Sequence, residues 1–157
     1  MSKVRIGRTL FAVLTLTAVG FATREAQAQA GLQYYAVTPC RAVDTRTGLG
    51  GSGIIPASTE KKFTMKGVCN ISASAKAVSL NVTVVGPTQD GFFALWPTQG
   101  TYPGVSTINF LANEPALANG AIVPVLAVGT PDLSVGYGTA TGSGQSHLVL
   151  DVTGYFQ

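Results

Sequence analysis

Three segments of the chain each place one polar side chain between apolar neighbours, in a pattern that could bind a ligand. They are Leu80-Asn81-Val82, Ile108-Asn109-Phe110 and Leu150-Asp151-Val152. If these segments were neighbouring strands, Asn81, Asn109 and Asp151 would form a ridge able to hold a sugar hydroxyl or a cation. The alternative, which the usual behaviour of polar strand residues favours, is that they bond nearby loops or stand on a solvated sheet face.

Aromatic residues gather in a second segment that could stack against a sugar ring. Phe92, Phe93 and Trp96 lie close together, and Tyr102 follows in the next loop. In a strand, Phe92 and Trp96 share one face while Phe93 points to the other. A flat surface that includes Trp96 and Tyr102 would suit carbohydrate, whereas packing in the core is the more common role of large aromatic rings.

Residues with catalytic potential are few and scattered. Ser79, His147 and Asp151 could be imagined as a Ser-His-Asp set, but the chain has no G-x-S-x-G motif. The carboxylates do not cluster as glycoside hydrolysis requires. His147 is the sole histidine, so we expect no metal site and no cofactor. The chain is interpreted as non-catalytic, and a small secreted hydrolase is the last of three hypotheses.

The segment Asp44-Thr45-Arg46 precedes a glycine-rich turn. An Asp and an Arg two residues apart on a strand can form an ion pair or bind a ligand carboxylate. We expect the structural role, in which the pair fixes the loop that follows. The glycines from Gly48 to Gly53 lack the lysine and the strand-loop-helix context of a phosphate site.

Residues 1–30 have the order of a secretory signal peptide. Lys3, Arg5 and Arg8 form a basic region, Thr9 to Phe21 an apolar region, and Ala28-Gln29-Ala30 a cleavage site. Cleavage would leave residues 31–157 as one domain that is secreted, at the cell surface or in the periplasm. The apolar region is too short to span a bilayer, and no later segment approaches twenty apolar residues, so no transmembrane anchor is expected.

Removal of the predicted signal peptide changes the charge of the protein. The whole chain has a net charge of +3 and a pI near 9.0, which would suggest an anionic partner. Residues 31–157 contain equal numbers of basic residues (Arg41, Arg46, Lys61, Lys62, Lys66, Lys76) and acidic residues (Asp44, Glu60, Asp90, Glu114, Asp132, Asp151). Nucleic acid is therefore not expected as a partner.

Cys40 and Cys69 are the only cysteines. In an oxidising compartment, two thiols in one small domain are most simply a disulfide, which would stabilise the fold by about 3 to 4 kcal/mol. A metal site would need more ligands, and a C-x-x-C redox pair is absent.

The rest of the chain alternates polar and apolar residues with a period of two. It predicts an all-β domain, a β-sandwich or jelly roll of about eight or nine short, mainly antiparallel strands. The expected strands are Tyr34 to Thr38, Arg41 to Thr45, Lys62 to Lys66, Lys76 to Val85, Phe92 to Trp96, Ser106 to Leu111, Ala121 to Val128, Asp132 to Tyr137 and His147 to Phe156.

An ordered series of motifs resembles a family of bacterial secreted domains. The motifs are P-C-R-A-V-D-T-R-T-G-L-G-G from Pro39, G-V-C-N-I-S-A-S-A-K-A-V-S-L-N-V-T-V from Gly67, G-F-F-A-L-W-P from Gly91, S-T-I-N-F from Ser106, A-N-G-A-I-V-P-V from Ala118 and H-L-V-L-D-V-T-G-Y-F from His147. Domains of this kind occur alone, in tandem or beside exported hydrolases, and the resemblance implies fold and location but no catalytic residue. Asn70 departs from the cysteine-bearing branch, which tends to carry glycine there.

The sequence thus predicts a secreted structural or interaction protein that associates with itself or with the cell surface. After cleavage the segment Gly31 to Thr38 would be a free terminus of strand character, and Gly31, Leu32, Gln33, Tyr34 and Tyr35 are the candidates for donation to a neighbour's sheet edge. The alternative is a carbohydrate-binding module that uses Trp96, Tyr102, Asn81, Asn109 and Asp151. The absence of an accompanying catalytic domain favours the first hypothesis.

Overall fold

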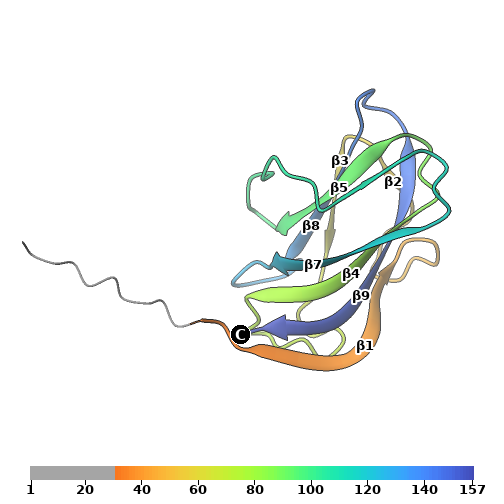
Figure 1. Ribbon diagram of the computed structural model, residues 1–157. Helices are drawn as coiled ribbons and strands as arrows, with labels where there is room; N and C mark the ends of the chain where they lie inside the picture. Colours follow the sequence, from red (N-terminus) through yellow and green to blue (C-terminus); the bar gives the residue numbers. More distant parts are fainter. Residues whose placement is uncertain (1–30) are drawn as a thin grey trace, which may run out of the picture. The chain divides into compact units, whose positions relative to one another are not determined.

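The computed structural model describes residues 31–157, which form two antiparallel β-sheets packed face to face (Figure 1). The predicted signal peptide lies outside the described residues. The strands are β1 Tyr34–Asp44, β2 Ile55–Pro56, β3 Thr59–Phe63, β4 Ala77–Val85, β5 Gly91–Pro97, β6 Ile108–Phe110, β7 Leu117–Pro124, β8 Leu133–Gly138 and β9 Gln145–Phe156. No helix occurs within residues 31–157, and the predicted all-β sandwich is confirmed.

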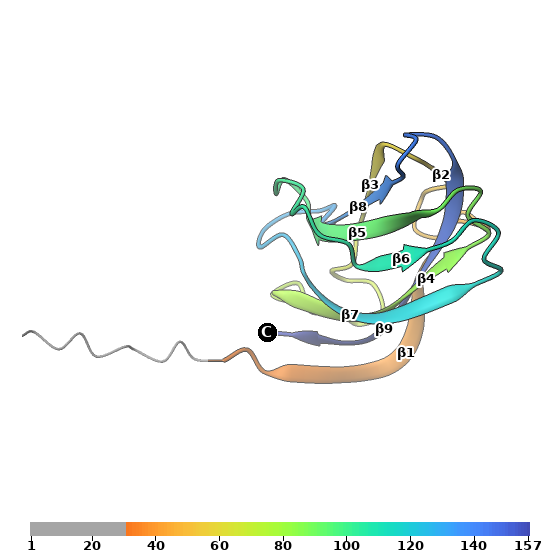
Figure 2. The same cartoon turned by 45° about the horizontal axis from the view of Figure 1, so that its top comes forward.

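The first sheet has the strand order β1-β9-β4-β7, and the short strand β2 also pairs with β9. The second sheet has the order β3-β8-β5-β6. Figure 2 shows the second sheet above the first, with β1 along the lower edge. Strand β1 therefore lies at one edge of the first sheet and β7 at the other, and the C-terminal strand β9 runs through the interior of that sheet.

The core fills the space between the sheets because alternate residues of each strand point inward. In β4, the side chains of Val78, Leu80, Val82 and Val84 are buried, while Ser79, Asn81 and Thr83 are half-buried on the other face. The second sheet contributes the inward residues Phe93, Leu95, Val135 and Tyr137. The alternation predicted for the strand from Lys76 to Val85 is confirmed.

Several predicted strand boundaries were wrong. The two segments predicted from Tyr34 and from Arg41 form one strand, β1, whose pairing with β9 shifts register between Ala36 and Cys40 and again between Arg41 and Val43. The two-residue strand Ile55–Pro56 was not predicted. Proline and two register shifts interrupt the ladder of β1, so the alternation in the sequence is broken although the strand continues.

Two further strands, β3 and β7, begin and end earlier in the chain than predicted. At their C-terminal ends, side chains or distant backbone groups take the place of the ladder partners. β3 ends at Phe63, and the N–H groups of Met65 and Lys66 donate to the buried carboxylate of Asp132 at 2.9 Å each. The strand predicted from Ala121 to Val128 is instead Leu117–Pro124. The ladder with β4 continues one step past Pro124, where the N–H of Val125 donates to the carbonyl of Lys76, and the N–H of Leu126 then donates to the distant carbonyl of Asp132.

The predicted disulfide between Cys40 and Cys69 is present, with the two Cα atoms 5.7 Å apart. It connects β1 to the loop between β3 and β4. In this loop Cys69 and Asn70 have φ angles of 53° and 60°. Glycine adopts this left-handed region most readily, and asparagine is among the few other residues that tolerate it, which explains how Asn70 can occupy this turn.

Candidate functional site

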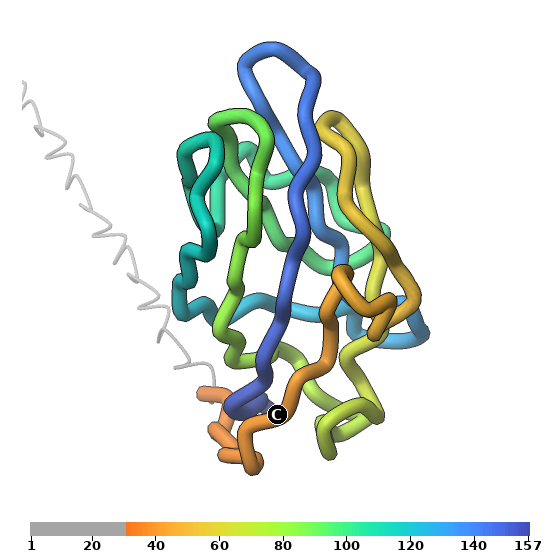
Figure 3. Tube along the Cα trace, turned by 90° about the vertical axis from the view of Figure 1, so that its right-hand side faces the viewer, coloured from red at the N-terminus to blue at the C-terminus, as the bar shows by residue number. Residues whose placement is uncertain are grey.

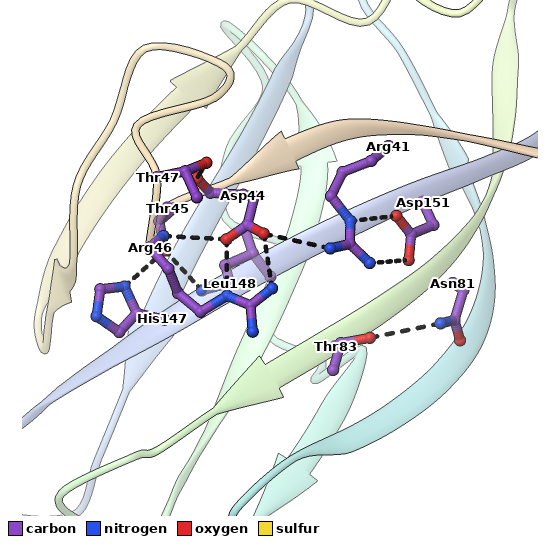
Figure 4. A network of polar contacts seen from close by, with 10 residues as sticks. All are labelled: Arg41, Asp44, Thr45, Arg46, Thr47, Asn81, Thr83, His147, Leu148 and Asp151. Carbon is purple, nitrogen blue, oxygen red and sulfur yellow. Dashed lines mark hydrogen bonds and ion pairs between the residues drawn. The ribbon is translucent and has the colours of Figure 1, made fainter.

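A cluster of charged residues lies on the outer face of the first sheet (Figure 4). Arg41 of β1 faces Asp151 of β9 across the sheet, and its Nε and Nη2 atoms donate to the two carboxylate oxygens at 2.8 and 3.1 Å. The Nη1 atom of Arg41 also lies 3.3 Å from Oδ2 of Asp44. We call Arg41, Asp44, Arg46 and Asp151 the Asp44 cluster.

Asp44 is the buried centre of this cluster. Its carboxylate accepts hydrogen bonds from the backbone N–H of Arg46 at 3.1 Å and from the Nε and Nη2 atoms of Arg46 at 2.8 and 2.6 Å. This hydrogen bonding to Arg46 lowers the pKa of Asp44 from 3.8 to about 2, against the opposing effect of burial. The predicted ion pair is confirmed, and it holds the turn that follows β1.

The residues considered as a catalytic set are not brought together. Asp151 is bound by Arg41, and the hydroxyl of Ser79 lies 2.9 Å from that of Thr153. His147 places its Nδ1 atom 3.1 Å from the hydroxyl of Thr45, which in turn accepts the N–H of Leu148 at 2.9 Å. Each group therefore takes part in a separate contact, and these contacts connect β9 to β1, to the turn after β1 or to β4.

The polar ridge predicted from three strands does not form. Asn81 and Asp151 are opposite each other on β4 and β9, but Asn109 lies on β6 in the other sheet. The amide of Asn81 donates to the hydroxyl of Thr83 at 3.4 Å and makes no bond with Asp151. The ridge depended on the three strands being neighbours, and alternation places a residue on a strand face without saying which sheet the strand joins.

A groove with aromatic walls lies on the outer face of the second sheet. It has a volume of about 390 Å³ and is lined by Ser58, Thr59, Glu60, Phe92, Trp96, Tyr102, Gly136, Tyr137 and Gly138. We call it the aromatic groove. Asn109, directly opposite Phe92 on β6, lies beside it. Three of the predicted sugar contacts, Trp96, Tyr102 and Asn109, are thus associated with this sheet.

The rings in the aromatic groove lie over glycine residues of β8. A Cβ atom added at Gly136 would be 3.0 Å from the Trp96 ring, and one added at Gly138 would overlap the Phe92 ring. Trp96 is 7% exposed and donates its Nε1–H to the carbonyl of Gly100, whereas Tyr102 is 48% exposed at the edge of the Trp96 ring. Tyr102 is therefore the more accessible aromatic surface.

Glu60 adds a carboxylate to this groove that sequence reasoning missed. Its Oε1 atom accepts a 2.6 Å hydrogen bond from the hydroxyl of Ser134 and lies 3.8 Å from Nζ of Lys62. The sequence feature that could have indicated a groove at this place is the run Ser134-Val135-Gly136-Tyr137-Gly138, in which every second residue is small. Such a run leaves space on one face of a strand for the side chains of its neighbours.

The N-terminal segment proposed for donation is paired within its own chain from Gln33 onward. Gln33 and Gln157 exchange backbone hydrogen bonds of 2.9 and 3.0 Å, and Tyr34 and Tyr35 pair with Phe156 and Tyr155. Figure 3 shows the start of β1 beside the end of β9. The prediction of a free terminus therefore needs correction, because these residues have strong backbone partners in the same sheet.

Comparisons of the chain with protein-family models, with curated proteins and with solved structures gave no match. The resemblance to a family of bacterial secreted domains stays a prediction. In residues 31–157 we find no group of three or more His, Cys, Asp and Glu side chains placed to hold a metal ion. The same residues contain no helix long and apolar enough to cross a membrane.

Proposed function

We propose that the protein is a non-catalytic, exported β-sandwich that associates with copies of itself or with components of the cell surface. The observation that carries the proposal is the position of residues 31–39, which lie along an open sheet edge and are exposed except at Val37. Leu32, Tyr34 and Tyr35 place exposed apolar surface on this edge. An edge of this kind can pair with another chain through backbone hydrogen bonds, while its side chains provide specificity.

Two features support a location outside the cytoplasm, either extracellular, at the cell surface or in the periplasm. The order of residues 1–30 is that of a signal peptide. The Cys40–Cys69 disulfide suits an oxidising compartment. The balance of basic and acidic residues in 31–157 also favours close packing of copies, since the subunits carry no net charge to repel one another.

The non-catalytic part of the proposal rests on how the polar groups are used. Asp44 and Asp151 are held by Arg46 and Arg41, so both carboxylates are tied into ion pairs. His147 contacts the hydroxyl of Thr45, which also accepts the backbone N–H of Leu148, and within residues 31–157 no carboxylate is hydrogen-bonded to His147. Groups engaged in this way stabilise strand ends and are poorly placed for proton transfer.

The proposal is tested with the full chain, exported through its own N-terminal region and purified from the medium or periplasm. Light scattering and electron microscopy would measure its size at rising concentration, and whole cells would be tested for retention. We expect oligomers or surface retention for the natural sequence and loss of both when residues 31–35 are deleted. Val128→Ala, at an 85% exposed site in the loop between β7 and β8, is the matched control. A protein that stays monomeric and does not bind cells would overturn the proposal.

A second candidate function is carbohydrate binding at the aromatic groove. The observation that favours it is the combination of an exposed tyrosine ring, a carboxylate and an amide around one groove, in Tyr102, Glu60 and Asn109. Aromatic rings stack on sugar rings while carboxylates and amides bond their hydroxyl groups. Asn81 and Asp151 take no part, because they lie on the other sheet.

Affinity electrophoresis in gels that contain soluble polysaccharides tests this candidate. Tyr102→Ala removes an exposed ring, and Leu111→Ala, which is 67% exposed and not in the groove, is the control. Trp96→Ala is a poorer test because the buried ring also supports the sheet. We expect retardation of the natural protein and of the control but not of Tyr102→Ala. Equal migration of all three in every polysaccharide would exclude the candidate.

A further inference from the structure

Residues 31–39 form a unit that is separate from the rest of β1, and we call it the N-terminal arm. Its ladder to β9 consists of the pairs Tyr34–Phe156, Tyr35–Tyr155 and Ala36–Gly154. The ladder then breaks, and regular pairing resumes only at Cys40. Pro39 stands in this break and has no N–H to donate to a ladder. The arm can therefore leave β9 without disturbing the pairs that follow.

The arm is held by two tyrosine contacts on β9. The ring of Tyr34 lies over Gly154, where an added Cβ atom would overlap it, and its hydroxyl donates to the carbonyl of Thr153 at 3.1 Å. The ring of Tyr35 stacks on Tyr155, with centroids 5.2 Å apart and planes 12° apart. The end of β9 thus has a surface that is complementary in shape to the arm.

Beyond the arm the chain is fixed at once. Cys40 is joined to Cys69, Arg41 is bound to Asp151, and Ala42, Val43 and Asp44 are buried. Within the arm, only Val37 packs against the core, and its side chain is half-buried. Release of the arm would therefore uncover little core, while the disulfide keeps the remainder of β1 in place.

We propose that the N-terminal arm exchanges between copies, so that the arm of one molecule occupies the end of β9 in the next. This inference rests on the proposed self-association and names its partner as a second copy of this chain. The structure itself identifies what fits the acceptor, since the identical segment is seated there within one chain. Exchange preserves the Tyr34–Gly154 and Tyr35–Tyr155 contacts. Its energetic cost is therefore confined to the change of backbone conformation at the break around Pro39 and to the translational freedom that two molecules lose on association.

The geometry of exchange determines the assembly. Two copies that trade arms reciprocally form a closed dimer, whereas an arm passed from each copy to the next forms a ring or an open filament. Fully extended, nine residues span about 30 Å, enough to reach an adjacent molecule. Cleavage after Ala30, as predicted, would place the new terminus immediately before the arm.

The test introduces cysteines at Gln33 and Gln157, which face each other across the ladder. The proposal does not depend on the side-chain contacts of either residue. Gln33 and Gln157 form a doubly hydrogen-bonded pair, in which Cα atoms are about 5.5 Å apart, within reach of a disulfide. Gln33→Cys and Gln157→Cys are produced as separate, differently tagged full chains, mixed, and oxidised mildly. We expect a covalent heterodimer on a non-reducing gel.

The control replaces the second variant with Val128→Cys, which is 85% exposed and lies in the loop between β7 and β8. A heterodimer yield no greater than in this control, from protein that does assemble, would overturn arm exchange and leave self-association standing. Absence of any assembly by the natural protein would overturn both. The double variant in a single chain should form an internal crosslink at low concentration and then fail to assemble.

A second substitution tests the acceptor side. Gly154→Ala places a methyl group where the Tyr34 ring lies, so we expect loss of assembly with the circular dichroism of the sandwich retained. Gly120→Ala is the matched control on β7, because a Cβ there meets no atom within 4 Å. Assembly of the Gly154→Ala protein at the level of the control would overturn the role of this contact and with it the proposed acceptor.

Discussion

Strand β1 is held differently on the two sides of Pro39. Before it, the N-terminal arm is exposed and depends on backbone pairing and two tyrosine contacts at the end of β9. After it, Cys40 is crosslinked, Arg41 and Asp44 are in ion pairs, and Val43 is fully buried. A single strand can therefore combine a fixed half, which stabilises the sandwich, with a half whose partner can be exchanged at little cost to the core.

The largest expected effect is on the fixed half. Replacement of both Cys40 and Cys69 by alanine should lower the free energy of unfolding by about 3 to 4 kcal/mol, because the disulfide closes a loop across a separation of 29 residues. Deletion of residues 31–36 should cost only about 1 to 2 kcal/mol, the worth of the Tyr34–Phe156 and Tyr35–Tyr155 aromatic pairs. Urea unfolding followed by fluorescence measures both. Equal losses would remove the distinction between the halves.

Asp44→Asn should have the next largest effect, about 1 to 2 kcal/mol, because it removes charged hydrogen bonds from Arg46 and the ion pair with Arg41. The folded-state pKa of Asp44 is lowered from 3.8 to about 2. The contribution of its carboxylate to the free energy of unfolding is therefore fully present above about pH 5. It is lost as the pH falls from about 4 towards 2.

Thermal unfolding between pH 2 and 7 would measure this dependence. The melting temperature of Asp44→Asn should fall less steeply below pH 4 than that of the natural protein. Glu114→Gln is the control, because Glu114 makes no ion pair among the described residues. A pH profile of Asp44→Asn that parallels the control would contradict the assignment.

The backbone conformation of Asn70, next to Cys69 of the disulfide, can be tested by two substitutions. Asn70→Val should lower the free energy of unfolding by about 1 kcal/mol, since a β-branched residue is strained at a φ of 60°. Asn70→Gly should change it by less than about 0.5 kcal/mol, because glycine adopts this conformation freely. Chemical unfolding of the two variants checks the difference, and equal stabilities would argue against a left-handed backbone at this residue.

The smallest effect is expected in the arm. Tyr35→Ala removes the ring stacked on Tyr155 and should cost about 0.5 to 1 kcal/mol. Tyr35→Phe keeps the ring and loses only an exposed hydrogen bond to Gln33, so its stability should match that of the natural protein. Hydrogen exchange at the amide of Gln157, which bonds the carbonyl of Gln33, reports the opening of the arm. Unchanged exchange in Tyr35→Ala would contradict the role of stacking.

Much of the fold could be predicted because alternation is a local property. In β4 the four apolar residues from Val78 to Val84 point inward as expected. In β5 the alternation predicted that Phe93 lies opposite Phe92 and Trp96, but not which of the two faces is inward. Boundaries were less predictable where side chains replace the ladder, as Asp132 does at the end of β3. The predicted disulfide followed from there being only two cysteines in the chain.

The candidate site could be predicted only in parts. The Asp44–Arg46 pair is local in sequence and formed as expected. The pairing of Arg41 with Asp151 joins residues from opposite ends of the domain, and Glu60 reaches the aromatic groove from a strand on the other side of β8. No pattern within a single strand specifies such neighbours.

By itself the sequence determined that residues 31–157 are all-β, which residues of most strands face the core, and that two cysteines would form one crosslink. Only the tertiary structure decided that Asn109 is separated from Asn81 and Asp151, and that the N-terminal arm pairs with β9 of its own chain. The physical reason is that side-chain alternation depends on local backbone geometry, whereas sheet order depends on long-range pairing and on the loops that carry the chain from one sheet to the other.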